Sequence, residues 1–186
     1  MKVDLHMHTN HSPDSEMSPE SLVSRCSQVG LDCIAVTDHN TVDGAFKVKQ
    51  LASFRVIIGE EIRSSEGEIT GLFLQDSIPK GLTPVETVHR IKEQGGLVSL
   101  PHPFDRFRRG VISPTGIADI ITHVDIVEVF NSRNNLQADN RKAHEFASQN
   151  KLLMSGVSDA HTTMELGRTY VEMPEFDGTA EGFKYA

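Results

Sequence analysis

The stretch DLHMHTNHSPDS, residues 4–15, begins in the first expected strand and carries three of the chain's nine histidines. His6 and His8 are separated by one residue. Side chains alternate in direction along an extended chain, so both imidazoles project to the same side. Two such ligands can grip one cation or two adjacent cations. The stretch therefore predicts a metal site at the end of a strand.

Short β-branched segments alternate with helical patterns along most of the chain. We expect strands at residues 2–5, 33–37, 55–59, 69–74, 97–100, 125–130, 153–156 and 168–171. Helices are expected between Ser18 and Gly30 and over residues 42–53, 83–95 and 136–150, with residues 104–113 as an irregular loop. Ser18-Pro19 and the capping box that starts at Thr83 mark two helix starts. This alternation predicts an α/β fold with a mainly parallel sheet.

Polar residues of the kinds that bind metals or phosphate follow six of these strands. They lie in the segments HMH (6–8), TDHN (37–40), GEEI (59–62), PHP (101–103), FNSR (130–133) and SDAH (158–161). In a parallel α/β barrel the carboxyl ends of the strands meet at one face, and the site is built there. We therefore expect these segments to converge.

The donor types in these segments indicate which ions would bind. Imidazole together with carboxylate suits zinc, manganese or iron, whereas an all-oxygen set suits calcium or magnesium. Without cations, the gathered carboxylates would repel one another in a partly desolvated site or would take up protons. We expect two or three divalent ions.

Composition restricts the other classes of protein. The chain has 186 residues, a net charge of −8, 24% charged residues and 6% aromatic residues. We expect one domain over residues 1–186, no membrane span and a cytoplasmic location. The two cysteines suggest buried thiols rather than a disulfide framework. An acidic chain without a basic stripe argues against duplex DNA as a partner.

The ordered segments DLHMHT…SPDS, TDHNTVDG, GEEI, PHP and SDAH resemble the PHP (polymerase and histidinol phosphatase) superfamily, and in particular its small stand-alone metal-dependent phosphoesterases. The resemblance implies a distorted, reduced (β/α)7 barrel with its metals at the strand C-termini. It also implies that His6 and His8 share one ion with Glu61 and Asp159. Glu61 would bridge to a second ion. The remaining implied ligands are His102 for that second ion and Asp14, His39 and His161 for a third.

One position departs from the family pattern. Family members generally supply a further histidine to the second ion from the segment after the glutamate strand, but EGEITGLFL, residues 66–74, contains none. Thr70, Glu68 or water would then supply the missing ligand of the second ion. The family spacing selects Glu61 rather than Glu60 as the ligand, and His11 is expected to lie in the loop or behind the ligands.

The chemistry implied is hydrolysis of a phosphate ester by metal-activated water. Candidate substrates are a small phosphorylated metabolite, a nucleotide or a short single-stranded oligonucleotide. Arginine forks suit phosphate oxygens, which favours Arg106 and Arg133. The resemblance also places Asn131 near the phosphate. His102 or His161 is a candidate donor of the leaving-group proton.

Two other functions remain open at this stage. The chain could be a non-catalytic, metal-stabilised module that binds a partner protein. It could also be an amidohydrolase-type C–N hydrolase, although no lysine ends an expected strand at the place where such sites recruit one. The last residues, AEGFKYA, resemble an unfinished helix, so the C-terminus could be incomplete. The sequence does not define the oligomeric state.

Overall fold

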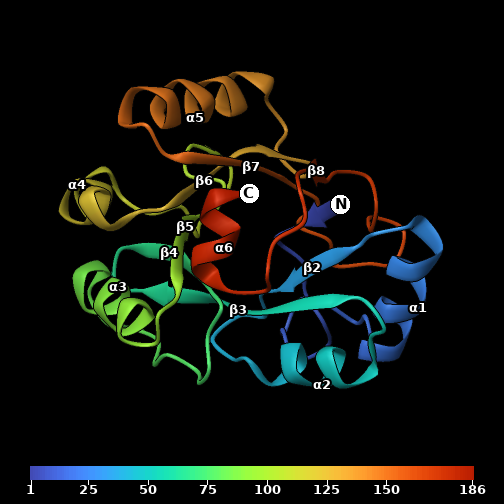
Figure 1. The fold of residues 1–186 in the computed structure, drawn as a ribbon. Helices are drawn as coiled ribbons and strands as arrows, with labels where there is room; N and C mark the ends of the chain where they lie inside the picture. Colours follow the sequence, from blue (N-terminus) through green and yellow to red (C-terminus); the bar gives the residue numbers. More distant parts are fainter.

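One eight-stranded sheet forms the centre of the protein, and the structure, a computed structural model, describes all residues from 1 to 186 (Figure 1). The strands lie in the order β7-β6-β5-β4-β3-β2-β1-β8. β7 and β8, the two ends of this order, also contact each other, so the sheet is a nearly closed barrel. The strands are β1 Lys2–Asp4, β2 Cys33–Val36, β3 Arg55–Ser64, β4 Gly67–Leu72, β5 Leu97–Leu100, β6 Ile126–Asn131, β7 Leu153–Val157 and β8 Val171–Glu172.

The strand directions confirm the α/β barrel and refine it. β1, β2 and β3 pair in parallel, as do β5, β6 and β7, but β4 and β8 run antiparallel to their neighbours. The barrel has eight strands, as many as the sequence predicted, and two of them break the parallel βα pattern. Only Ser65 and Glu66 separate β3 from β4, and a parallel return needs a crossover of about a dozen residues. Gly67, with a φ of 135°, begins β4 after this short turn.

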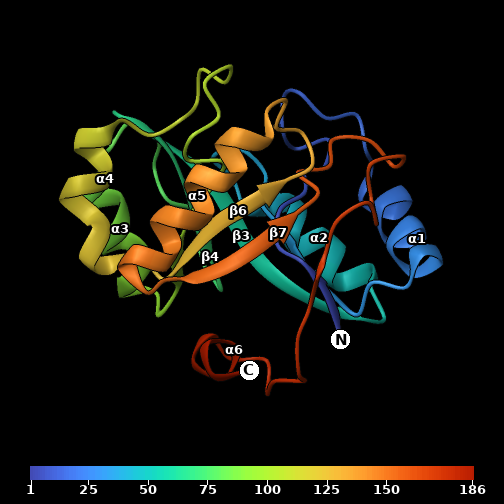
Figure 2. The same cartoon turned by 90° about the horizontal axis from the view of Figure 1, so that it is seen from above.

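The first five helices cover the outside of the barrel, and the sixth lies at one end of it (Figure 2). They are α1 Pro19–Val29, α2 Asp43–Leu51, α3 Pro84–Glu93, α4 Pro114–Ile120, α5 Gln137–Asn150 and α6 Ala180–Tyr185, with a 3-10 turn at Ile121–His123. The four expected helices are confirmed, and Ser18 and Thr83 cap α1 and α3 as expected. Residues 104–113 form the expected irregular segment. The short α4, capped by Ser113, was not expected from the sequence.

The apolar core has two layers, one on each face of the sheet. The larger layer packs the strands against the helices and contains 29 buried residues, among them Leu22, Ile34 and Ile91. The smaller layer contains 11 buried residues and lies on the other face of the strands, inside the barrel. Phe176 and Phe183 from the C-terminal segment belong to this inner layer. The barrel interior is therefore a packed core.

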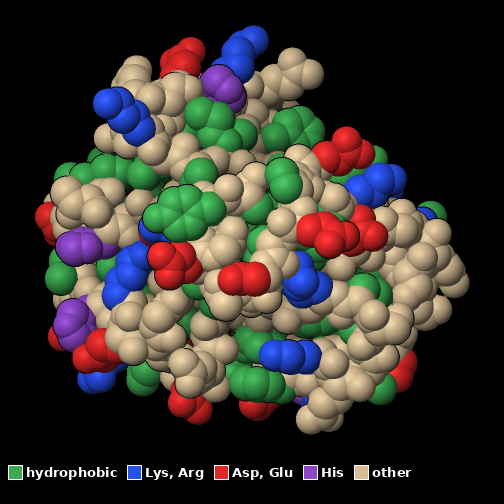
Figure 3. All heavy atoms as spheres, viewed as in Figure 1, with side chains coloured by type: hydrophobic (Ala, Val, Ile, Leu, Met, Phe, Trp, Pro, Cys, Tyr) green, Lys and Arg blue, Asp and Glu red, His purple; other side chains and the backbone are tan.

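The C-terminal segment closes one end of the barrel. Figure 2 shows α6 on the side where the N-terminus of the chain lies, which is where the strands begin. On the face seen in Figure 3, basic and acidic side chains are interspersed, and no extended basic surface is visible. At the opposite end, where the parallel strands finish, lie the loops that carry the polar segments. No helix of this protein has the length and apolar character that a bilayer crossing requires.

Candidate metal centre

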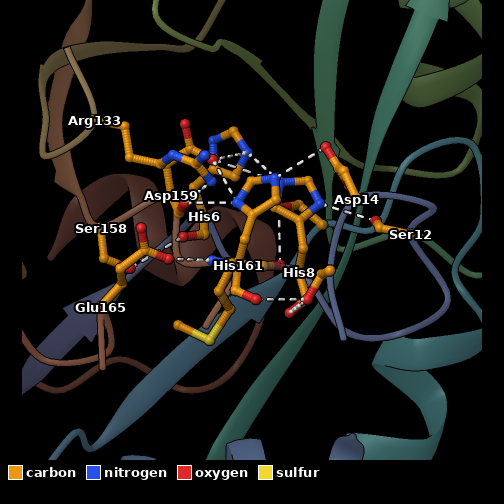
Figure 4. A network of polar contacts seen from close by, with 12 residues as sticks. His6, His8, Ser12, Asp14, Arg133, Ser158, Asp159, His161 and Glu165 are labelled. Atoms are coloured by element: carbon orange, nitrogen blue, oxygen red, sulfur yellow. Dashed lines mark hydrogen bonds and ion pairs between the residues drawn. The ribbon is translucent and has the colours of Figure 1, made fainter. Parts of the chain in front are cut away.

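The expected polar residues converge at the carboxyl ends of the parallel strands, although they come from distant parts of the chain (Figure 4). Loop residues continue the sheet there: Met7 pairs with Ala160, and His39 pairs with Glu61, each in a parallel bridge. These bridges bring the loops after β1, β2 and β7 alongside one another and alongside β3. The side chains that come together are His6, His8, Asp14, His39, Glu61, His102, Asp159 and His161.

Two of these residues have a left-handed backbone. His102 has a φ of 32° and Asp159 a φ of 53°. Residues other than glycine adopt this region at a cost of about 1–3 kcal/mol, and such positions concentrate at functional sites. Both side chains are buried and turn into the cluster. The fold therefore accepts local strain where it orients candidate ligands.

The tightest group joins His6, His8, Glu61 and Asp159. The Nε2 atoms of His6 and His8 are 3.0 Å apart, and Glu61 Oε2 lies 3.3 Å and 3.4 Å from them. Asp159 Oδ1 lies 3.6 Å from both imidazole nitrogens. All four side chains are almost fully buried. The Nε2 atoms of His6 and His8 and the Oε2 atom of Glu61 thus form one compact group, and Asp159 Oδ1 lies beside its two imidazoles.

This spacing fits a divalent cation. Ligands at tetrahedral corners about 2.0–2.1 Å from a zinc-sized ion lie roughly 3.3–3.4 Å from one another. Asp159 Oδ1 is buried and has no hydrogen-bond partner among the protein atoms. An unsatisfied buried carboxylate oxygen is costly unless something else takes the place of water. The residues present therefore fit a metal ion.

Glu61 reaches a second group through its other oxygen. Glu61 Oε1 lies 3.0 Å from His102 Nε2, and Glu68 Oε2 lies 3.9 Å from the same nitrogen. Among the alternatives at this place, Glu68 is the residue whose carboxylate joins Glu61 and His102. Glu60 points away from the cluster, where its Oε2 accepts a hydrogen bond from the backbone N–H of Ile78. The geometry agrees with the choice of Glu61 over Glu60.

A third group contains His8, Asp14, His39 and His161. Asp14 Oδ2 lies 3.2 Å from His39 Nε2 and 3.1 Å from His161 Nε2. Asp14 is the most accessible member, at 49% side-chain exposure, so this group opens to solvent. His8 borders both this group and the first one. His8 therefore belongs to two of the three groups of candidate ligands.

Three imidazoles have hydrogen bonds that leave Nε2 free to face the cluster. His6 Nδ1 lies 2.6 Å from Glu128 Oε1, and His161 Nδ1 lies 2.9 Å from the carbonyl oxygen of Asp159. His8 Nδ1 lies 3.0 Å from the hydroxyl of Ser12. An acceptor at Nδ1 keeps the proton on that nitrogen and leaves the Nε2 lone pair available to a cation.

Asp38 organises the loop behind these ligands. Its buried carboxylate accepts hydrogen bonds from the backbone N–H of Thr9 at 2.6 Å, from the Thr9 hydroxyl at 2.6 Å and from the Ser12 hydroxyl at 3.0 Å. Because Ser12 donates to Asp38, its oxygen can accept from His8. His11 contacts only Thr9 in this network and lies outside the three groups, as expected.

Glu128 is the functional residue that sequence reasoning missed. It is 3% exposed, bonds His6, and accepts hydrogen bonds from the His102 backbone N–H at 2.9 Å and from Asn131 Nδ2 at 3.1 Å. The available signal was an acidic residue inside the otherwise apolar strand IVEVF. A charged residue in a buried strand generally has a partner.

Opposite charges hold the cluster's groups ionised. Burial alone would raise the pKa of Glu61, but His6 and His102 keep that pKa well below its ordinary value. Burial would likewise raise the pKa of Asp159, and His6, His8 and Arg108 outweigh it, so this pKa is also lowered. Burial would lower the pKa of His6, yet Glu128, Asp159 and Glu61 raise it well above normal. The carboxylates thus favour a positive charge at this position, and a bound cation would take the place of the proton on His6 Nε2.

A hollow of about 360 Å³ leads from solvent to this cluster. Arg108 is ion-paired with Asp159 and lies 3.3 Å from Asp105, and Arg133 Nη1 lies 3.5 Å from the carbonyl oxygen of Asp159. The lining residues are Asp14, His39, Glu68, Asp105, Phe107, Arg108, Arg109, Gly110, Arg133, Asn135 and His161.

Two of the expected substrate-binding residues lie elsewhere. Arg106 does not line the hollow, because its guanidinium pairs with Asp139 at 2.7 Å on the surface beside α5. Asn131 is 1% exposed, and its side-chain amide donates a hydrogen bond to Asp159 Oδ2 at 3.0 Å. It therefore orients a candidate ligand instead of facing the hollow. Arg133 does line the hollow. Arg108 and Arg109 line the hollow, where the sequence had suggested Arg106.

Fold and site together define an α/β barrel with a cluster of metal-ligand residues at the carboxyl ends of its parallel strands. The chain belongs to the PHP domain family, which matches residues 4–151, and a PHP-associated region matches residues 137–183. Two uncharacterized proteins of Methanocaldococcus jannaschii are similar to it. One is 42% identical over 71% of this chain and 82% of its own length, and the other is 38% identical over 95% of this chain and 72% of its own length.

Solved structures share the fold at low sequence identity. A protein of Bifidobacterium adolescentis described as a metal-dependent phosphoesterase is 17% identical and has a TM-score of 0.73, over 91% of this chain and 92% of that one. Endonuclease Q bound to a 27-mer duplex with an abasic lesion is 17% identical with a TM-score of 0.71, over all of this chain and 55% of that one. The expected exclusion of duplex DNA is therefore not supported, because a barrel of this fold occurs in a protein that binds a duplex.

Proposed function

We propose that this protein is a metal-dependent hydrolase of phosphate esters that uses two or three divalent cations. One observation carries the proposal: His6, His8 and Glu61 present donor atoms 3.0–3.4 Å from one another, and the buried Oδ1 of Asp159 beside the two imidazoles has no hydrogen-bond partner. Membership of the PHP domain family supports it. The remaining proposed ligands are Asp14, His39, His102 and His161.

The donor set favours manganese, zinc or iron, because it mixes imidazole with carboxylate and contains no thiolate. When bound, such cations lower the pKa of coordinated water towards about 7 and neutralise phosphate charge. Glu61 presents one oxygen to each of two groups, which suits it to link neighbouring cations. Glu128 and Ser12 keep the ring nitrogens of His6 and His8 in the form that binds a cation.

The residues around the hollow favour an anionic substrate. Arg108, Arg109 and Arg133 provide guanidinium groups at its rim, and guanidinium forks bind phosphate oxygens in pairs. Arg108 is oriented by two buried carboxylates, Asp105 and Asp159, and is 23% exposed, so its remaining N–H groups can meet a ligand. We assign phosphate binding to Arg108 and Arg133.

A proton is also needed for the departing alcohol. Of the two candidate histidines, His161 lines the hollow, whereas His102 is 1% exposed and does not. Both histidines are also proposed cation ligands with Nε2 facing the cluster, so neither keeps a free proton there, and we assign this role to a water in the hollow. Small phosphorylated metabolites, nucleotides and oligonucleotides all fit the chemistry of the site, and the low-identity likeness to endonuclease Q keeps DNA among the substrates to test.

The amidohydrolase alternative receives less support from the geometry. Sites of that kind usually recruit a lysine or a further histidine pair from later strands, and no lysine lines this hollow. The alternative of a metal-stabilised module without catalysis differs from the proposal in one measurable respect, which is turnover.

The test compares hydrolysis by wild-type protein and two variants after chelation and reloading with manganese, zinc or ferrous iron. An aryl phosphate, a nucleotide and a short oligonucleotide serve as substrates. We expect His6→Ala and Asp159→Ala to lose at least about a hundredfold in kcat/KM, because each removes a proposed ligand. His144→Ala, a change of the same type at an exposed position on α5, should keep full activity. Equal activity in folded His6→Ala, Asp159→Ala and wild-type proteins would contradict the proposal.

A further inference from the structure

The group of Glu61, Glu68 and His102 differs in chemistry from the rest of the centre. It contains two carboxylates and one imidazole, whereas His8, Asp14, His39 and His161 supply three imidazoles and one carboxylate. Glu61 and His102 are each 1% exposed, and their Oε1 and Nε2 atoms are 3.0 Å apart. Glu68 completes the group from β4, with 15% of its side chain exposed.

A buried hydroxyl points to a ligand at the same place. Thr70 lies directly opposite Glu61 in the antiparallel pair of β3 and β4. Side chains of directly opposed residues project from the same face of a sheet, so the Thr70 and Glu61 side chains share a face. Thr70 is 1% exposed, and its Oγ1 has no hydrogen-bond partner among the protein atoms. An unsatisfied buried hydroxyl beside two carboxylates indicates that a polar ligand belongs there.

The fold holds Glu68 in position through the segment of residues 104–113. The backbone N–H of Glu68 donates to the carbonyl oxygen of Gly110 at 2.8 Å, and Arg63 Nη1 lies 3.2 Å from Glu68 Oε1. A Cβ atom at Gly110 would lie 1.7 Å from Glu68 Oε2. Glycine at this position therefore leaves room for the carboxylate beside His102.

We propose that Glu68 is the third ligand beside Glu61 and His102, in the place of the histidine that the family pattern expects, and that its carboxylate adapts this cation position to manganese. This inference rests on the proposed metal-dependent function and deepens it. Carboxylate oxygens suit manganese, whereas imidazole-rich positions suit zinc. Replacing one carboxylate of this group with an imidazole shifts its preference towards zinc.

The experiment measures metal binding rather than activity. Chelator-treated protein is titrated with Mn²⁺ by calorimetry, and bound Mn²⁺ and Zn²⁺ are counted by elemental analysis after gel filtration. We expect Glu68→Gln to bind one Mn²⁺ fewer than wild type, or to bind it at least about tenfold more weakly. Glu68→His should bind the same number of ions but favour zinc in a competition with equal Mn²⁺ and Zn²⁺. Glu93→Gln, on the exposed surface of α3, should match wild type.

A second variant guards against a folding defect. Gly110→Ala keeps the charge of Glu68 but places a Cβ atom where its carboxylate lies, so we expect the same loss of one Mn²⁺ position. Wild-type Mn²⁺ stoichiometry and affinity in both Glu68→Gln and Gly110→Ala would overturn the inference and leave the proposed hydrolase standing. A wild-type protein that binds no divalent cation would instead overturn the proposed function itself.

Discussion

At the scale of single residues, the centre depends on groups that touch the candidate ligands from behind. Glu128 accepts from His6, from the backbone of His102 and from Asn131, and Asn131 in turn holds Asp159. One carboxylate inside β6 thus orients ligands that come from three separate loops. Such supporting hydrogen bonds fix the ring tautomer and raise the basicity of the ligating nitrogen.

Glu128→Gln tests this support. The amide oxygen accepts a hydrogen bond from His6 more weakly than a carboxylate does. We therefore expect the affinity for the cation bound by His6 and His8 to fall by about 10–100-fold. Calorimetric titration of chelator-treated protein with Zn²⁺ measures the change. Glu93→Gln, which removes an exposed carboxylate of the same kind, should leave the affinity unaltered. Wild-type affinity in Glu128→Gln would show that His6 needs no such partner.

The raised pKa of Glu60 predicts that the stability of the fold depends on pH. Burial raises the pKa of Glu60 to about 7, from an ordinary value of 4.5, because only one of its oxygens has a hydrogen-bond donor. The folded protein therefore keeps a proton that the unfolded chain releases above about pH 4.5. The stabilisation of the fold by protonated Glu60 is therefore fully present below about pH 4.5 and is lost as the pH rises through about 7.

We accordingly expect Glu60→Gln to gain stability relative to wild type as the pH rises. The gain between about pH 5 and pH 8 should reach at least about 1 kcal/mol, since one pKa unit corresponds to about 1.4 kcal/mol. Urea unfolding followed by circular dichroism at both pH values measures it. A constant difference between the two proteins across this range would contradict the raised pKa.

At the scale of secondary-structure elements, the β3–β4 hairpin sets where Glu61 and Glu68 lie. A Cβ atom at Gly67 would lie 2.2 Å from the Cα of Ile112, so the turn packs backbone against backbone on the segment that carries Arg108. Gly67 also has a φ of 135°, a backbone conformation that residues with a Cβ atom rarely adopt. The hairpin and residues 104–113 therefore form one packed unit beside the site.

Gly67→Ala should disrupt this unit. We expect a loss of at least about 2 kcal/mol in the free energy of unfolding, since backbone strain and a backbone clash add. Gly81→Ala is the matched control: its φ is also positive, at 86°, but nothing lies within 4 Å of the added Cβ. That variant should lose only about 1 kcal/mol. Equal losses in the two variants, measured by urea unfolding, would show that the close approach to Ile112 contributes nothing.

At the scale of the whole molecule, the two ends of the barrel have different roles. The carboxyl ends of the strands hold the ionisable cluster, and the other end is closed by aromatic packing of the C-terminal segment. The ring centroids of Phe73 and Phe183 lie 5.8 Å apart, and those of Phe176 and Phe183 lie 5.3 Å apart in an edge-on arrangement. Lys184 Nζ lies 3.0 Å from Asp125 and ties α6 to the start of β6.

Phe183→Ala should separate stability from metal binding. Removing a ring that is 7% exposed from the inner core should cost about 3–4 kcal/mol of unfolding free energy, with no effect on the stoichiometry of bound cations. Tyr185→Ala, where the side chain is 85% exposed, should stay within about 0.5 kcal/mol of wild type. Urea unfolding and elemental analysis of the folded variants provide the two readouts. Loss of bound metal in folded Phe183→Ala would show that the two ends are coupled.

The sequence predicted most of the barrel because local signals were strong. Caps at Ser18 and Thr83 marked two helices, and short apolar runs marked the strands. The short α4 was missed because its seven residues give too little periodicity. The hairpin was missed because one expected strand ended early, at residue 59, and the next began late, at residue 69, which hid how short the β3–β4 connection is.

The candidate site divides in the same way. The sequence alone supplied the candidate ligands, through the residue types at the ends of the expected strands and through the resemblance to the PHP superfamily, which selected Glu61 over Glu60. These candidates are His6, His8, Asp14, His39, Glu61, His102, Asp159 and His161. Only the tertiary structure brought Glu68 beside His102, paired Arg106 with Asp139 and placed Glu128 behind His6. Those outcomes depend on which distant side chains pack together, and a buried charge takes the partner that three-dimensional packing leaves within reach.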